Sequence, residues 1–312
     1  VVKVRGRKTF RRDGKYLVPQ GGTWQPGLAD GILRGIALEL VPPVSIEDVF
    51  VRSSVARDTL SAHVTVANRT DIEIAAALDF KLSAESGKRA AYPELPRLQC
   101  RLAPRETRTV EVPAVPWGLG PESYWWPNVP YRRGYRAQLH RLRVTLSADG
   151  NRAHEASARF GFREFAVDGN RYRLNGVVCN LRGDNQQEAN FGTDAYGVCP
   201  GFGPPSKNNA GWPGAVDNLL RANHNVLRIH QVPCTPYMLD VCDELGLMII
   251  DETPVRGSER KEDFVAGRES MIACARELAR RDRRHPSVVL WSCANEIWGE
   301  YGLALALQGA MH

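Results

Sequence analysis

The sequence predicts a multidomain β plus α/β protein, in which an immunoglobulin-like β-sandwich is followed by a partial (β/α)₈ TIM barrel. Apolar residues recur at every second position from about residue 46 to residue 160, which is typical of half-buried strands. After Asp168-Gly169 short apolar runs alternate with helix-like segments, which is typical of βα units. At 312 residues the chain is longer than one ordinary domain, so two or three domains are expected.

The composition is that of an ordinary globular protein, with 43% hydrophobic and 24% charged residues. No apolar run approaches the ~20 residues of a membrane-spanning helix, so no membrane contact is expected. The net charge of +6 comes mostly from dispersed arginines. The one basic cluster, Arg5 to Arg12, is interpreted as a solvated face rather than a nucleic-acid site. The sequence leaves open whether the protein is a homo-oligomer, and whether it is secreted or periplasmic rather than cytoplasmic.

The β-sandwich is predicted from sets of alternating apolar residues separated by turns. A spacer that positions the barrel is the favoured role of this domain. The run Tyr124-Trp125-Trp126-Pro127-Asn128 has two interpretations, a surface that stacks on sugar rings or a loop packed on the next domain, and packing is favoured. The alternating sets are Leu60, Ala62, Val64 and Val66; Ile74, Ala76, Leu78 and Phe80; Val110 and Val112; and Leu142, Val144 and Leu146.

Four parallel strands are predicted in the second half, at residues 173–181, 225–230, 247–251 and 288–291. The last of these is continuously apolar and is predicted to be buried on both faces. Between the second and third strands, Thr235 is expected to cap a helix that ends at Gly246.

Asn295-Glu296 follows the fourth predicted strand, where polar side chains of a parallel barrel face a cleft. A Glu at this place can protonate a leaving oxygen, and an Asn beside it can bind a sugar hydroxyl, which suits cleavage of a glycosidic bond. For the dipeptide alone, the simpler interpretation is a helix-capping Asn with an exposed Glu.

Leu290-Trp291-Ser292-x-x-Asn295-Glu296, after Arg284-His285-Pro286-Ser287, resembles the acid/base signature of glycoside hydrolase family 2. Residues 161–164, 174–176, 182–185, 225–228 and 239–252 resemble further elements of that family, in the same order. The resemblance implies a retaining, exo-acting β-glycosidase with Glu296 as acid/base and its nucleophilic Glu on a later strand, absent from this chain. A β-galactoside is the first expected substrate, followed by a glucuronide and a mannoside.

The same resemblance divides the chain into three parts. Residues 1–44 are expected to be the C-terminal part of a jelly-roll sugar-binding domain, and residues 45–160 the immunoglobulin-like sandwich. Residues 161–312 supply only four βα units, so they are expected to form the first half of the barrel.

Further candidate substrate-binding residues lie where the predicted strands end. Arg228 could orient Glu296 or another carboxylate, or form a structural ion pair. His230 stands one place from the family's usual Arg-x-x-His pattern, and Trp298 is either a subsite wall or a packing residue. The full set is Asp184, Arg228, His230, Glu252, Asn295 and Trp298.

Neither a cofactor nor a metal is expected. Galactosidases of the family that hold Mg²⁺ carry a Glu-x-His element where this chain has Val255-Arg256-Gly257-Ser258, and an Arg cannot ligate a cation. The seven cysteines form no Cys-x-x-Cys pair, so no zinc site is predicted. The zinc and magnesium patterns are thus both missing from the sequence.

The family resemblance implies a carbohydrate partner, either a β-glycoside or an oligosaccharide. The competing hypothesis is a non-catalytic carbohydrate-binding or scaffolding protein with a degenerate barrel.

Overall fold

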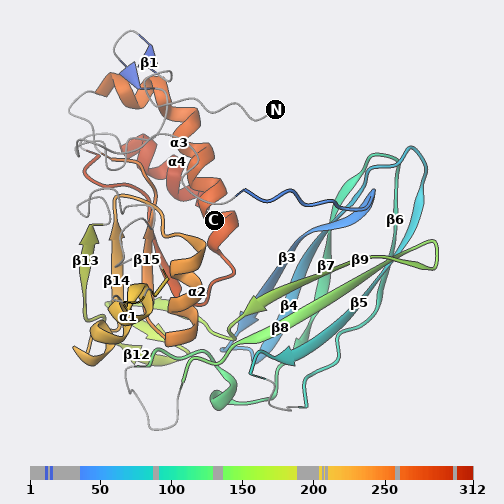
Figure 1. Cartoon of the computed structure of the whole chain (residues 1–312), viewed down its shortest axis with the longest axis horizontal. Helices are drawn as coiled ribbons and strands as arrows, with labels where there is room; N and C mark the ends of the chain where they lie inside the picture. The colour runs from blue at the N-terminus through green and yellow to red at the C-terminus, as the bar shows by residue number, and fades with distance from the viewer. Residues whose placement is uncertain are drawn as a thin grey trace.

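The computed structural model describes residues 11–12, 15–16, 36–86, 91–128, 136–187, 204–205, 207, 210–256, 261–297 and 301–311. The β-sandwich and the parallel strands with their helices lie side by side (Figure 1). Most of the predicted jelly-roll segment, residues 1–44, falls outside the described residues. Within it, β1 (Arg11–Arg12) pairs antiparallel with β2 (Lys15–Tyr16).

The sandwich consists of two antiparallel sheets, with strand orders β3-β4-β7 and β6-β5-β8-β9, which confirms the predicted immunoglobulin-like domain. The domain boundaries proposed from the sequence stay predictions. The strands are β3 (Val44–Ser54), β4 (Thr59–Asn68), β5 (Ile74–Ala84), β6 (Leu98–Leu102), β7 (Thr107–Pro116), β8 (His140–Ala148) and β9 (Asn151–Phe160).

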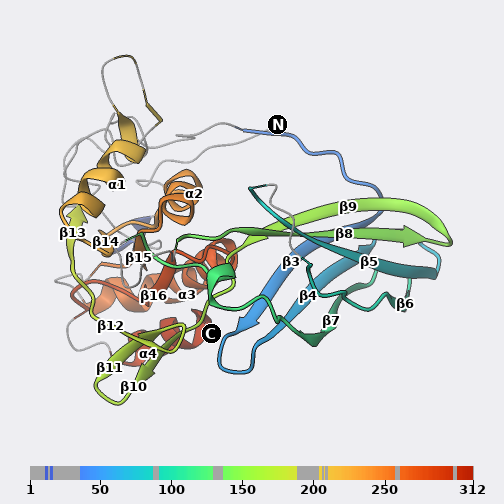
Figure 2. The same cartoon turned by 90° about the horizontal axis from the view of Figure 1, so that it is seen from below.

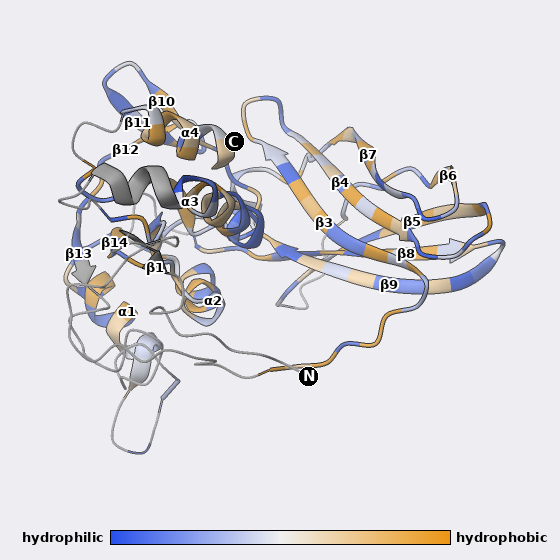
Figure 3. Cartoon of the chain, turned by 90° about the horizontal axis from the view of Figure 1, so that it is seen from above, coloured by the Kyte–Doolittle hydropathy of each residue, from blue (hydrophilic) through white to orange (hydrophobic). Residues whose placement is uncertain are grey.

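The core of the sandwich is formed by the alternating residues that the sequence singles out. Leu60 and Val64 on β4 are fully buried, as are Leu142 and Leu146 on β8 in the other sheet. Apolar and polar segments alternate along β3 in Figure 3. Because one face of each sheet must leave water, the two-residue period fixes which face turns inward.

The predicted first barrel strand, residues 173–181, is wrong. This stretch instead forms β11 (Arg171–Leu174) and β12 (Val177–Cys179) of a small antiparallel sheet with β10 (Phe165–Asp168). Between β11 and β12, Asn175 and Gly176 have φ of 52° and 79°, as a two-residue type I′ turn requires, so the chain reverses here. In Figure 1 β12 lies below the parallel strands, at the edge where they begin, and Figure 2 shows the small sheet from that side.

The barrel half is a four-stranded parallel sheet in the order β13-β14-β15-β16. The three later strands confirm the predictions within one residue at either end, and the first strand begins only after the small sheet. The strands are β13 (Gly183–Gln187), β14 (Val226–His230), β15 (Met248–Glu252) and β16 (Val288–Ser292), with helices α1 (Gly211–Arg221), α2 (Pro236–Leu245), α3 (Lys261–Asp282) and α4 (Tyr301–Met311). None of the described helices is both long and apolar enough to cross a membrane.

Helix α2 begins and ends as predicted. Thr235 accepts a hydrogen bond from the backbone N of Met238 at 3.2 Å, and Gly246 ends the helix in the left-handed conformation with φ 77°. Gly246 also lies against the sandwich, because a Cβ atom there would come 2.6 Å from the backbone N of Asn128. That N–H donates to the Gly246 carbonyl at 3.0 Å, so the residue that ends the helix also forms a hydrogen bond with the neighbouring domain.

Strand β16 differs from its prediction, because it is not buried on both faces. Only Val288 is buried, whereas Val289 to Ser292 are half-exposed. Among the described residues β16 pairs with β15 alone and forms an edge of the sheet. The prediction of a strand from this continuous apolar run is confirmed, and the prediction that both of its faces are buried is wrong.

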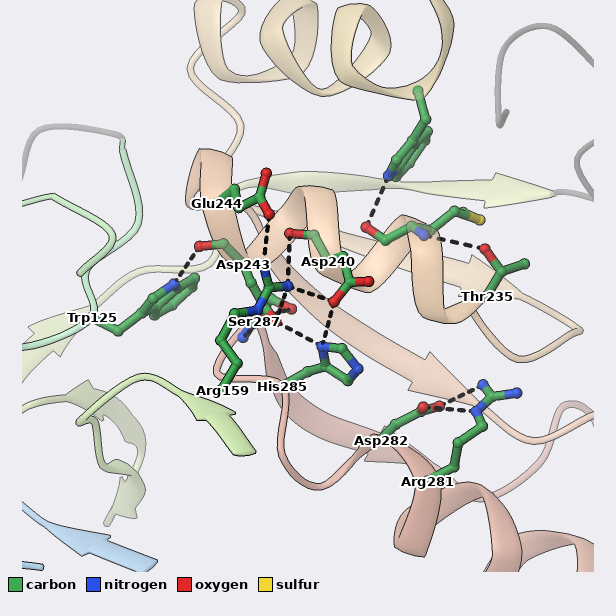
Figure 4. Close-up of polar contacts among 12 residues, drawn as sticks. Trp125, Arg159, Thr235, Asp240, Asp243, Glu244, Arg281, Asp282, His285 and Ser287 are labelled. Atoms are coloured by element: carbon green, nitrogen blue, oxygen red, sulfur yellow. Dashed lines mark hydrogen bonds and ion pairs between the residues drawn. The ribbon is translucent and has the colours of Figure 1, made fainter. Parts of the chain in front are cut away.

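An ion-pair network joins strand β9 of the sandwich to helix α2 of the barrel half (Figure 4). The guanidinium of Arg159 donates to Asp240 Oδ1 at 2.5 Å and to Glu244 Oε1 at 2.6 Å. Its Nη2 lies 3.5 Å from Asp243 Oδ2. One arginine of the sandwich thus contacts three carboxylates on one helix, which fixes the orientation of the two domains.

Asp243 is the buried centre of this junction, with 2% of its side chain exposed. Its Oδ1 accepts from the backbone N of Ser287 at 3.0 Å and from Ser287 Oγ at 2.6 Å, and its Oδ2 lies 2.6 Å from His285 Nδ1. The Asp243 carbonyl accepts from Trp125 Nε1 at 2.8 Å. Tyr124, Trp125 and Trp126 are all buried, and the bond of Trp125 to α2 agrees with the prediction that this run packs on the next domain.

A pair of buried carboxyl groups lies between β15 and α3. Asp251 is fully buried, and its Oδ1 accepts from the backbone N of Cys234 at 2.8 Å. Asp282, also buried, is bound by the guanidinium of Arg281 at 2.7 and 2.5 Å. Burial first, and the neighbouring Asp282 second, raise the pKa of Asp251 well above its ordinary value.

Asp251→Asn is expected to flatten the pH dependence of stability. A folded-state pKa above the unfolded one means that the folded protein binds more protons between the two values, so the unfolding free energy falls as pH rises from about 4 towards the raised pKa. The asparagine keeps an acceptor for the Cys234 N–H and does not titrate. Urea unfolding at pH 5 and pH 8 should show a smaller difference for Asp251→Asn than for the parent. An equal difference, or the same flattening in the exposed control Asp217→Asn, would contradict this assignment.

Candidate active site

Glu252 ends strand β15 and is the buried anchor of the candidate site. It has no exposed surface. Its Oε2 accepts from Arg228 Nε at 2.7 Å, and also from Arg228 Nη2 and from Ser292 Oγ. Its Oε1 lies 2.9 Å from His230 Nδ1. Since these partners come from β14 and β16, the carboxylate on β15 aligns polar side chains from both flanking strands.

Asn295 is connected to this carboxylate through Arg228. Arg228 Nη2 donates to Asn295 Oδ1 at 3.1 Å, and the backbone N of Asn295 donates to the Val255 carbonyl at 2.9 Å. Asn295 is 8% exposed, and its Nδ2 is buried without a hydrogen-bond partner among the described residues. The arginine thereby sets the orientation of the amide: the oxygen is occupied, and the NH₂ group remains as a donor for another molecule.

Glu296 follows directly and differs from its neighbours in being exposed. Its backbone has φ 53°, in the left-handed region that non-glycine residues seldom adopt. The chain therefore turns at this residue, immediately after the buried amide. A carboxyl group that is exposed and adjacent to a fixed amide can reach both a bound ligand and water.

The open question about Arg228 has a definite structural answer. Its carboxylate partner is Glu252 rather than Glu296, and the arginine side chain is 31% exposed. His230, with 9% of its side chain exposed, is held by the same carboxylate. His230 is the last residue of β14, as predicted, whereas Arg228 is the third of its five residues and reaches the carboxyl end through its side chain. Glu252 binds both side chains.

The prediction that Asp184 stands at the end of the first barrel strand is wrong. It is the second residue of β13 and pairs with Leu227, whereas the strand continues to Gln187, which pairs with His230. Three residues of strand correspond to about 10 Å, so Asp184 lies towards the opposite edge of the sheet. Its exposed carboxylate accepts from the backbone N of Asn185 at 2.7 Å. Trp298, the other predicted site residue, lies outside the described residues.

Two residues at this end of the sheet were not among the sequence candidates. Ser292 donates to Glu252, and Arg256 pairs through its backbone with Asn295 in a parallel β-bridge. Ser292 stands within the Leu-Trp-Ser motif at the end of an apolar run, which is a signal that could have identified it. Arg256 was considered from the sequence only as a reason against a metal.

Asp240, Asp243 and His285 at the domain junction have ligand atoms within 4.8 Å of one another. A metal ion there would compete with the guanidinium of Arg159, which already contacts both carboxylates. Ser287 donates to Asp243 as well, so the oxygens are engaged by protein donors. We interpret this cluster as a structural ion-pair network.

Two sequence models of one family match the chain. The model described as "Glycosyl hydrolases family 2" matches residues 44–163, and the one described as "Glycosyl hydrolases family 2, TIM barrel domain" matches residues 216–308. The first match covers the sandwich. The second covers the strands that carry Arg228 and Glu252 and the segment after β16 that carries Asn295.

Individual proteins show the same relationship. The chain is 27% identical over 274 residues to the β-glucuronidase of Mus musculus, which covers 85% of this chain and 36% of that protein. It is 24% identical over 293 residues to the β-galactosidase of Alteromonas mediterranea, covering 91% and 26% respectively. The chain therefore spans well under half the length of the curated relatives it matches.

Among solved structures, the fold is similar to that of a GH2 β-galacturonidase from Eisenbergiella tayi bound to galacturonate, with a TM-score of 0.68 and 19% identity. The superposition covers 87% of this chain and 45% of that one. At this identity the likeness supports the arrangement of sandwich and barrel strands.

Proposed function

Because the chain belongs to glycoside hydrolase family 2, we propose that it forms part of a retaining, exo-acting β-glycosidase in which Glu296 is the acid/base. The observation that carries the proposal is the hydrogen bond from Arg228 to Asn295 Oδ1. It leaves the Asn295 NH₂ group as a fixed donor beside an exposed carboxyl group. A sugar hydroxyl next to the scissile bond would accept from that donor.

In the proposed mechanism Glu296 first acts as an acid and then as a base. Its carboxyl proton passes to the glycosidic oxygen as a second carboxylate, on a later strand, attacks the anomeric carbon and forms a glycosyl-enzyme. The Glu296 carboxylate then takes a proton from water, which attacks the same carbon and releases the sugar with its configuration retained. The two carboxyl groups should lie about 5–5.5 Å apart in the complete barrel.

The other residues at this end of the sheet divide into positioning and binding roles. Glu252 has no exposed surface, so it acts by holding Arg228, His230 and Ser292. Arg228, His230 and Asn295 keep the predicted substrate-binding role, as does Trp298. Asp184, three residues before the end of β13, is assigned no role in this site.

The sugar expected first from the sequence was a β-galactoside, with a glucuronide second. The similar curated proteins named above include a β-glucuronidase and a β-galactosidase, and β-glucuronidases from several further mammals share 27–29% identity with the chain. These relatives favour the reverse order, with a β-glucuronide first.

The test is the stereochemistry of the first product, in a protein that carries this chain together with the strand bearing the nucleophile. Proton NMR during hydrolysis of a p-nitrophenyl β-glycoside should show the β-hemiacetal first and the α-anomer only later, by mutarotation. The α-anomer appearing first would exclude the retaining mechanism. Binding of the sugar without hydrolysis would favour the alternative of a non-catalytic carbohydrate-binding protein.

A further inference from the structure

Two buried hydrogen-bond donors lie without an acceptor beside Glu296. They are Asn295 Nδ2 and Arg256 Nε, and both lack a hydrogen-bond partner among the described residues. Buried polar atoms are nearly always paired in folded proteins. Two unpaired donors on neighbouring residues therefore indicate a place where a bound molecule supplies the acceptors.

The backbone places both side chains on the same face. Arg256 and Asn295 pair in a parallel β-bridge, in which the backbone N of Asn295 donates to the Val255 carbonyl at 2.9 Å. Residues paired in this way are about 5 Å apart and project to the same side of the sheet. Since the Asn295 side chain contacts Arg228, the side chain of Arg256 leaves the backbone on the side that carries the candidate site.

The chemistry of these atoms defines the missing partner. A guanidinium has donors only, and the one acceptor of the Asn295 side chain is already engaged by Arg228. No carboxylate in the described part of the chain lies within ion-pair distance of Arg256, and Glu252 is already engaged by Arg228, His230 and Ser292. A guanidinium in this setting matches an oxyanion, and a carboxylate fits its planar donor geometry best.

We propose that Arg256 is the specificity-determining residue for a carboxylate on the sugar, beside Asn295, which donates to a hydroxyl of the same sugar, so that the substrate is a β-hexuronide rather than a neutral β-hexoside. This inference rests on the proposed function for the location of the sugar. Arg256 would bind the carboxylate of the substrate and take no part in proton transfer, which is the role of Glu296.

The test measures binding, so that it does not depend on turnover. In a full-length protein carrying Glu296→Gln, isothermal titration calorimetry compares D-glucuronate and D-galacturonate with the neutral sugars D-glucose and D-galactose. The protein with Glu296→Gln alone, which is the parent in this experiment, is expected to bind an acidic sugar more tightly than its neutral counterpart. Adding Arg256→Met should lower the affinity for the acidic sugar by about 10- to 100-fold and leave that for the neutral sugar within about twofold, since one charge-assisted contact is lost.

Two further variants complete the design. Arg256→Lys, which keeps the charge and loses the planar fork, should retain part of the preference. Arg57→Met, at an exposed arginine of the sandwich, should change neither affinity. An equal loss for acidic and neutral sugars in Arg256→Met, or a parent without a preference, would overturn the proposal. Thermal unfolding of each variant separates a misfolded site from a lost contact.

Failure of this proposal and failure of the proposed function give different results. Retained stereochemistry without a preference for acidic sugars would leave a glycosidase that acts on a neutral sugar and would reject the role of Arg256. A preference for acidic sugars that depends on Arg256, in a protein that does not hydrolyse glycosides even with Glu296 intact, would leave a uronate-binding protein and would reject the catalytic role of Glu296.

Discussion

Glu296→Gln is expected to lower the hydrolysis of alkyl glycosides by about 10²–10⁴-fold, in a protein that also carries the nucleophile. The amide has nearly the same shape as the carboxyl group but holds no transferable proton. A poor leaving group needs that proton, because its oxygen would otherwise depart as an alkoxide. The measurement is kcat/KM for a methyl β-glycoside in the parent and the variant.

An aryl glycoside with a good leaving group should respond differently to the same change. Its first step needs little protonation, so a burst of phenol should appear, followed by a stall because no base activates water. Azide needs no base and should restore turnover with a β-glycosyl azide as the product. Glu269→Gln, at an exposed position on α3, is the matched control and should behave as the parent does. Alkyl-glycoside hydrolysis near the parent's rate in Glu296→Gln would show that another residue is the acid.

The elements that could be predicted from the sequence are those with strong local signals. The two-residue alternation identified the sandwich strands, and the cap at Thr235 with the stop at Gly246 identified α2. The error at residues 173–181 has an equally local cause. Asn175-Gly176 is a strong hairpin signal, and reading the flanking residues as one strand ignored it.

The candidate site was predicted only in part, because its geometry depends on contacts between residues distant in the sequence. Glu252 was predicted to face a substrate, but its partners Arg228 and Ser292 are 24 and 40 residues away, and together they bury it. Arg228 and Asn295 are 67 residues apart. The spacing of apolar residues along the sequence cannot predict a hydrogen bond between residues so far apart. The register of the parallel strands determines which side chains meet, and it places Asp184 three residues before the end of β13.

Asp243→Ala is expected to lower the free energy of unfolding by about 3–5 kcal/mol, because it removes a buried charge that serves several donors. The Ser287 N–H, the Ser287 hydroxyl and His285 Nδ1 would all lose their partner. Arg159, which lies 3.5 Å from the same carboxylate, would lose one of three negative neighbours at the junction. The effect should therefore extend to the docking of the sandwich on the barrel strands.

Urea unfolding followed by tryptophan fluorescence measures this loss, since Trp125 is buried at the junction and donates to the Asp243 carbonyl. Asp240→Ala is the matched control on the same helix. Its carboxylate also contacts Arg159, but half of its side chain is exposed, so the cost should be about 0–1 kcal/mol. If the two variants cost the same, burial does not set the strength of the junction, and Asp243 is one surface contact among several. If Asp243→Ala alone is costly, the buried carboxylate of Asp243 holds the segment that leads into β16, through His285 and Ser287, and also the sandwich, through Arg159.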